Sequence, residues 1–261
     1  MNRKYEISTK ENREFLKASC EDLLNFGHRF PSPNGGSYYL GDDGTPWKDR
    51  NRETWITCRM AHVYSLGLML GHEGSGELVD AALKGLKGEL HDDKNGGWYA
   101  GVTPEGGIVP NKQCYAHAFV ILAASSALTA GRPGAKELLE EALAVYDRHF
   151  WNEEEGLACD TWNTEFTMLD DYRGLNANMH TVEAFLAAGD VTGDKKYHIR
   201  AGRIIDHVIQ WAEDNSWRIP EHFTKEWVAD LDCNRDRPDD PFKPYGATPG
   251  HGIEWARLIT Q

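Results

Sequence analysis

The sequence predicts an all-α protein in which a ring of inner helices is surrounded by outer helices. Apolar residues recur at helical spacing in eight segments of the 261-residue chain. The segments alternate in character, since AKELLEEALAVYDRHF has one charged face whereas QCYAHAFVILAASSALT is apolar nearly all round. A helix of the second kind is buried on most sides, so an array of α-hairpins satisfies both patterns.

Start and stop signals delimit the helices in chain order. A capping box of Ser8 and Glu11 precedes the first helix, which ends before Gly27. Gly71 and Gly131 follow the second and fourth helices. The predicted helices span Thr9–Phe26, Thr54–Leu70, Ser75–Leu90, Gln113–Thr129, Ala135–Phe150, Ala177–Ala188, Lys195–Ala212 and Gly252–Thr260.

Gly-rich and aromatic connections join these helices. The stretches HDDKNGGWYAGVTPEGG and WNEEEGLACDTWNTEFT are typical of small hairpins or Trp-bearing loops rather than core strands. A further stretch of about thirty residues from Trp217, with five prolines, is longer than ordinary connections, so we expect it to be functional. No Ser/Gly linker divides the chain, and residues 1–261 are predicted to form a single domain.

Composition excludes several classes of partner. The chain has 28 Lys plus Arg against 41 Asp plus Glu, and its net charge of −13 disfavours nucleic acid and anionic lipid. The first residues lack the apolar region of a secretory signal, and AHAFVILAASSALTA is too short to span a bilayer. The five cysteines form no C-x-x-C pair. We therefore expect free thiols, a cytoplasmic protein, and no membrane or nucleic-acid partner.

Polar residues recur on the inner helices, about once per hairpin. Each must face a partner or a cavity, because an unpaired buried polar group costs roughly 1 to 3 kcal/mol. Two pairs, His180 with Glu183 and His251 with Glu254, are spaced i, i+3, which places each carboxylate beside its histidine. That arrangement suits general acid–base chemistry. The remaining polar residues of this kind are Arg59, His62, Gln113, Tyr115, His117 and Asn176.

Structural roles compete with functional ones. A lone buried histidine is usually a satisfied core residue, which we expect for His62 and His117. An H-x-x-E pair is also half of a di-iron site, but such sites need carboxylates that these helices lack, so no metal is predicted. Arg59 stands among apolar residues and needs an anion or a substrate hydroxyl. The outer-helix histidines are expected in solvent: His149, His198 and His207.

Four blocks of the chain resemble the N-acylglucosamine 2-epimerase superfamily, most closely its aldose–ketose isomerase branch of mannose and sulfoquinovose isomerases. The blocks are TWITCRMAHVYSLG, NKQCYAHAFVILAASSA, DDYRGLNANMHTVEAFLAAGDVTGD and PYGATPGHGIEWARL. The resemblance covers nearly the whole chain, in the family's order. It implies an (α/α)6 barrel and cofactor-free isomerisation of a free monosaccharide by proton transfer between C1 and C2 through an enediol.

The resemblance also implies roles for individual residues. His251 of the G-H-x-x-E block becomes a catalytic acid/base, with Glu254 as its carboxylate. Arg59 of the T-C-R-M block reaches substrate oxygens, and Arg235 of CNRD stabilises the oxyanion of the enediolate. Substrate contacts are implied for His180, Asn176, Tyr115 and Trp55.

The family's barrel has six hairpins, whereas the eight helices of this chain make about four. The resemblance places the family's second catalytic histidine beyond Gln261. We therefore expect a domain that lacks the C-terminal third. Three alternatives stay open: the chain is a fragment, it is a natural short form, or a homo-oligomer or ring-completing chain closes the ring. Three functions stay open: an aldose–ketose isomerase of the mannose/fructose type, a 2-epimerase of N-acylglucosamine or a related sugar, and a non-catalytic sugar-binding or regulatory module.

Overall fold

The computed structural model describes residues 6–261, and eight α-helices lie in that range. They are α1 Lys10–Gly27, α2 Thr54–Met69, α3 Ser75–Leu86, α4 Cys114–Thr129, α5 Ala135–His149, α6 Leu175–Thr192, α7 Lys195–Asp214 and α8 Pro249–Ile259. Each corresponds to one predicted helix. The prediction of an all-α protein is therefore confirmed, with shifts at several helix ends.

Local hydrogen bonds and turns explain these shifts. Helix α1 is capped by Thr9 rather than Ser8, because the Thr9 hydroxyl accepts a hydrogen bond from the Asn12 N–H at 3.1 Å. Helix α6 is longer than predicted and ends at Gly193, which adopts a left-handed conformation with φ of 71°. Helix α3 ends four residues before the predicted Leu90, where the chain turns into the next connection.

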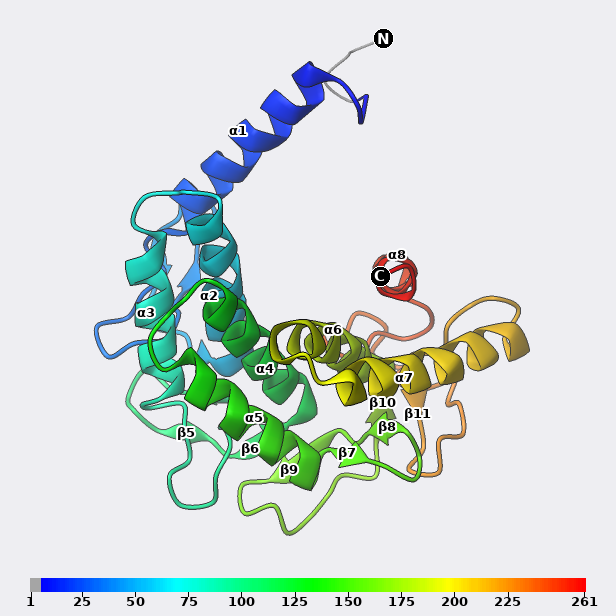
Figure 1. Cartoon of the computed structure of the whole chain (residues 1–261). Helices are drawn as coiled ribbons and strands as arrows, with labels where there is room; N and C mark the ends of the chain where they lie inside the picture. The colour runs from blue at the N-terminus through cyan, green and yellow to red at the C-terminus, as the bar shows by residue number, and fades with distance from the viewer. Residues whose placement is uncertain (1–5) are drawn as a thin grey trace.

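The helices form two layers. Helices α2, α4 and α6 pack side by side as the inner layer, and α3, α5 and α7 cover them from outside (Figure 1). Helix α8 contacts α6 and is the next inner helix along the arc. Most residues of α4 are buried, whereas α5 buries only its inward face. The predicted alternation of inner and outer helices is therefore confirmed.

Both ends of the arc present apolar side chains to solvent. Helix α1 extends away from the other helices at one end (Figure 1), and its Leu16 and Leu23 are 55% and 70% exposed. At the other end, Ile253 of α8 is 75% exposed. Nothing within residues 6–261 covers these faces.

Very short strands connect the helices: β1 Tyr39–Leu40, β2 Pro46–Trp47, β3 Arg52–Glu53, β4 Gly101–Val102, β5 Ile108–Val109, β6 Asn111–Gln113, β7 Trp151–Asn152, β8 Leu157–Ala158, β9 Thr161–Asn163, β10 Arg173–Gly174 and β11 His222–Phe223. All pairings are antiparallel, in the orders β1-β2, β3-β4-β5, β6-β9, β7-β8 and β10-β11. Strands β3, β6 and β10 lead directly into α2, α4 and α6. The pairings therefore hold the N-terminal ends of the inner helices at one rim.

The small hairpins predicted from the Gly-rich connections are confirmed by the β4-β5 and β7-β8 pairs. All five cysteines carry free thiols, as predicted. Within the part of the chain that the structure describes, no helix combines the length and the apolar character needed to cross a membrane.

Candidate functional site

Equivalent positions of the inner helices meet in one row of contacts. The sixth residues of α2, α4, α6 and α8 are Arg59, Phe119, His180 and Glu254. The Arg59 guanidinium lies 4.6 Å from the centre of the Phe119 ring, which lies 4.5 Å from the His180 ring. His180 Nδ1 in turn lies 4.0 Å from a carboxylate oxygen of Glu254. We call these four residues the central row.

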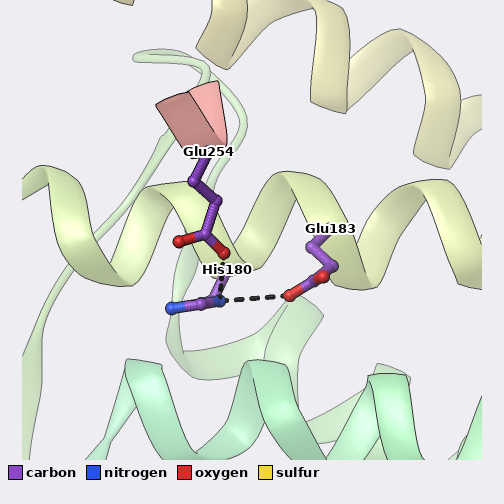
Figure 2. Close-up of side chains that lie close together, drawn as sticks. All are labelled: His180, Glu183 and Glu254. Carbon is purple, nitrogen blue, oxygen red and sulfur yellow. Dashed lines mark hydrogen bonds and ion pairs between the residues drawn. The ribbon is translucent and has the colours of Figure 1, made fainter. Parts of the chain in front are cut away.

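Two carboxylates from different helices face His180 (Figure 2). Its Nδ1 lies 3.2 Å from Glu183, one turn along α6, so the predicted pairing of these two residues is confirmed. Burial raises the pKa of Glu183, but the hydrogen bond and charge of His180 and the nearby Arg257 outweigh it and lower that pKa to about 2. The Arg257 guanidinium donates to Glu183 at 2.8 Å. Glu183 is therefore ionised beside His180.

The predicted pairing of His251 with Glu254 is wrong, because His251 pairs with Glu221 instead. His251 Nδ1 lies 2.9 Å from the Glu221 carboxylate, and this hydrogen bond raises the pKa of His251. His251 lies in the first turn of α8. Because helical side chains point towards the N-terminus of their helix, the His251 ring reaches Glu221 at the N-terminal end of α8. Glu254, one turn further on, faces His180 and affects His251 only through its charge.

Glu221 is a site residue that the sequence analysis missed. It is buried, and its second carboxylate oxygen accepts a hydrogen bond from the Thr248 N–H at 3.2 Å, immediately before α8. Its sequence context could have revealed it, because Glu221 is an acidic residue among the apolar residues Ile219, Pro220 and Phe223. Arg59 was selected by the same kind of context. An acidic side chain in such a setting needs a partner.

Arg59 lies in the central row with an unpaired charge. It donates a hydrogen bond to the Tyr115 hydroxyl at 3.2 Å and lies 5.4 Å from the centre of the Trp55 ring. Among residues 6–261, no carboxylate lies within ion-pair distance of Arg59. Its positive charge is therefore available to a ligand.

A pocket of about 290 Å³ opens beside the central row. The second residues of α2, α4 and α6, which are Trp55, Tyr115 and Asn176, all line it. Tyr115 joins the pocket to the row, because its ring centre lies 5.1 Å from that of His180. The structure thus brings Trp55, Tyr115 and Asn176 together in one cavity beside His180.

The structure does not bring Arg235 to this site. Its side chain is 71% exposed and forms an ion pair with Asp232 at 3.1 Å within the same turn. The long stretch that contains it contributes Phe242 and Lys243 to the pocket instead. We therefore no longer assign Arg235 an oxyanion role, since its charge is in solvent and already paired.

Two further histidines of the inner helices are satisfied within the fold. His117 is buried, with Nδ1 2.7 Å from the Gln113 carbonyl, and its Nε2 accepts from the Trp98 N–H at 3.1 Å. Burial lowers the pKa of His117 to about 3. His62 Nδ1 lies 2.7 Å from the Ser126 hydroxyl, and burial lowers the pKa of His62 as well. The expectation of a satisfied core histidine is confirmed for His117, whereas His62 is only half-buried.

The outer-helix histidines were all expected in solvent, and this is correct only for His198. His149 is half-buried because its ring stacks on Phe166, with ring centres 3.8 Å apart. His207 is half-buried against Trp211.

His180, Glu183 and Glu254 also form the one group in residues 6–261 whose ligand atoms are close enough to hold a metal ion, within 4.8 Å of one another. Arg257 already donates to Glu183, so a cation bound there would have to compete with this guanidinium. The absence of a metal stays a prediction.

Comparisons with known proteins show the family to which the chain is similar. The N-acylglucosamine 2-epimerase (GlcNAc 2-epimerase) family matches residues 35–261. A D-mannose isomerase of Thermobifida fusca is 43% identical over 250 residues, which are 95% of this chain and 61% of that protein. The crystal structure of a D-mannose isomerase superposes with a TM-score of 0.87 at 30% identity, covering 95% of this chain and 64% of that one. A cellobiose 2-epimerase from Spirochaeta thermophila shares the fold, with a TM-score of 0.78 at 18% identity over 97% of this chain and 65% of that one.

Proposed function

The chain belongs to the N-acylglucosamine 2-epimerase family, and from this membership we propose that it carries the sugar site of an aldose–ketose isomerase that interconverts mannose and fructose. One observation carries the proposal: Arg59, with an unpaired charge, and His180, held by carboxylates, adjoin a pocket lined by aromatic and amide side chains. The two D-mannose isomerases that the chain resembles at 43% and 30% identity support the same reaction.

His251 is the proposed acid/base. Its Nδ1–H donates to Glu221, so the lone pair of Nε2 is left to accept a proton from C2 of the sugar. Removal of that proton forms the C1–C2 double bond and moves the electron pair onto the carbonyl oxygen. Return of the proton from His251 to C1, with transfer of the O2 hydroxyl proton to O1, gives the ketose.

The negative charge of the enediolate needs stabilisation, because a proton on carbon is only weakly acidic. Arg59 is the proposed source, since its guanidinium has no carboxylate partner among the described residues. His180 is proposed to hold a sugar hydroxyl through Nε2, because its Nδ1 is engaged by Glu183. Trp55 and Tyr115 would pack against the apolar face of the sugar ring.

We propose that the arc is four of the six hairpins of an (α/α)6 barrel. Inner helices α2, α4 and α6 pack against outer helices α3, α5 and α7 as three of these hairpins, and α8 and α1 would each belong to a hairpin at an end of the arc. The chain spans 61% of the length of the Thermobifida fusca relative. The remaining hairpins would supply the second catalytic histidine and cover the exposed apolar faces of α1 and α8.

Incubation with mannose in D₂O tests the function. Fructose as product, with deuterium at C1, supports the isomerase. Glucose with deuterium at C2 would instead make the protein a 2-epimerase, which the family description favours and which shares the same proton abstraction. Binding of mannose with neither product nor exchange at C2 would contradict catalysis and leave a sugar-binding module. A His251→Ala variant controls for exchange that does not depend on the protein.

A further inference from the structure

The residues that immediately precede α2, α4 and α6 line the pocket two positions before Trp55, Tyr115 and Asn176. We call the part of the pocket that they line the polar level. Before α2 and α4 these residues are Glu53 and Gln113, and both line the pocket. Before α6 the equivalent residue is Gly174, which has no side chain to contribute.

Asp160 supplies the polar group that Gly174 lacks. Its carboxylate oxygen Oδ2 accepts a hydrogen bond from the Gly174 N–H at 2.6 Å, and Asp160 lines the pocket at this level. A β-carbon at position 174 would lie only 2.6 Å from the Tyr172 hydroxyl, so the glycine leaves room for Tyr172. The carboxyl group of Asp160 therefore completes the level formed by Glu53 and Gln113.

The position of Asp160 is fixed by the inner helices. Its carbonyl oxygen accepts from the Cys114 N–H at 2.7 Å, at the start of α4. Two residues earlier, the Ala158 N–H and carbonyl bond to the side-chain amide of Asn178 in α6, at 2.9 and 3.0 Å. A carboxyl group held in this way binds a ligand without a further ordering cost.

Three side chains of the pocket each have a polar group that makes no hydrogen bond to a described residue. Within residues 6–261, the Oδ1 atom of Asp160 and the side-chain amides of Gln113 and Asn176 make no hydrogen bond. All three side chains are half-buried and line the pocket. Trp55 and Phe242 provide apolar walls beside them. Unpartnered polar groups between aromatic walls are what a ligand with several hydroxyl groups requires.

We propose that Asp160 determines substrate specificity by binding hydroxyl groups at the end of the sugar remote from C1 and C2. The inference rests on the proposed isomerase function for the orientation of the sugar. Gly174 immediately precedes α6 and lies six residues before His180, which is about 9 Å along the helix axis. A single hexose hydrogen-bonded at both ends bridges such a gap.

The charges at this level favour a neutral sugar. Two carboxyl groups, of Glu53 and Asp160, face one amine, that of Lys243. Burial raises the pKa of Glu53 and raises that of Asp160 to about 7, so a further negative charge beside them is unfavourable when they are ionised. A hydroxymethyl group instead donates a hydrogen bond to them, so a neutral hexose suits this level better than an anionic one.

Calorimetric titration tests the proposal without catalysis. The ligands are 1,5-anhydro-D-mannitol, which cannot open to an aldehyde, and its 4-deoxy and 6-deoxy analogues. With the unaltered chain, at least one deoxy analogue should bind about tenfold more weakly than the parent. In Asp160→Asn that difference should disappear, because the missing hydroxyl has lost its acceptor. Asn keeps an oxygen for the Gly174 N–H, so the fold is retained.

Asp171→Asn is the matched control, because Asp171 is exposed and lies outside the pocket. It should leave the tenfold difference unchanged. The proposal is overturned if the loss of affinity on removing a hydroxyl is the same for Asp160→Asn as for the unaltered chain. It is also overturned if mannose 6-phosphate binds the unaltered chain as tightly as mannose does. The proposed isomerase can fail separately, since mannose that binds in this pattern without being converted would refute only the catalytic function.

Discussion

His251 and His117 both lie near the start of an inner helix, yet their surroundings shift their pKa values in opposite directions. The ring nitrogens of His117 meet two neutral groups, a backbone carbonyl and a backbone N–H, and the Phe150 ring centre lies 4.6 Å away. Burial therefore keeps it neutral, with its pKa lowered to about 3. His251 meets the Glu221 carboxylate, and its pKa is raised.

One carboxylate neighbour therefore separates a histidine whose pKa is lowered by burial from one whose pKa is raised. His117 holds the Trp98 segment against α4, which requires a permanent acceptor at Nε2. His251 is half-buried in the first turn of α8.

Replacing the histidines should separate activity from stability. In a form of the protein that converts mannose, His251→Ala should lower kcat/KM about 10² to 10⁴-fold, the usual contribution of a positioned acid–base group. His117→Ala should change kcat/KM far less but destabilise the fold, because it leaves the Trp98 N–H unpaired. Steady-state kinetics and chemical unfolding of both variants check this. Equal, small losses of activity would make both histidines structural.

Removing the charge of Glu221 should shift the pH profile of activity. A general base acts in its neutral form, so activity should rise as the pH passes the raised pKa of His251. Glu221→Gln should move this acid limb to lower pH and lower kcat/KM about 10 to 100-fold, because a hydrogen bond to a charged group is lost. Glu155→Gln, at an exposed carboxylate, is the control. If the acid limb of the pH profile stays in place in Glu221→Gln, Glu221 does not act through His251.

The two histidines should also affect stability in opposite pH ranges. Because the pKa of His117 is lowered in the fold, its contribution is complete above the unfolded value of 6.5 and is lost as the pH falls. Between pH 6.5 and 5 this loss should be about 1 to 2 kcal/mol of unfolding free energy. The raised pKa of His251 gives the reverse sign, with a contribution present below 6.5 and lost at higher pH.

Urea unfolding at several pH values measures these contributions. His117→Gln should lose the acid-dependent part of the unfolding free energy, since glutamine does not titrate. If its slope between pH 6.5 and 5 equals that of the unaltered chain, His117 is not the buried neutral group described above.

The smallest effect is expected for an exposed histidine. His198 on α7 lies 3.0 Å from Asp190, and both residues are exposed. His198→Ala should change the unfolding free energy by less than about 0.5 kcal/mol and leave kcat/KM unaltered. A larger change in the unfolding free energy or in kcat/KM would show that an exposed histidine on an outer helix cannot be replaced without effect.

The helices, their alternation and much of the site follow from local patterns in the amino-acid sequence. Helical periodicity is a local property set by backbone hydrogen bonds, so apolar spacing predicted α4 as buried and α5 as half-buried. The His180–Glu183 pair was predictable for the same reason, because both residues lie on one helix at a fixed spacing. Trp55, Tyr115 and Asn176 were found through the resemblance, and they meet because each is the second residue of an inner helix.

Contacts between side chains of different helices and loops depend on the tertiary structure and could not be predicted from the sequence. Glu221 is thirty positions from His251, and Asp160 reaches the pocket through a bond to Gly174. Arg235 lies in the same long stretch that brings Lys243 into the pocket, yet it remains in solvent. The path of such a stretch follows from many weak packing contacts and not from a repeating backbone geometry. Spacing in the sequence therefore says little about which of its side chains point inward.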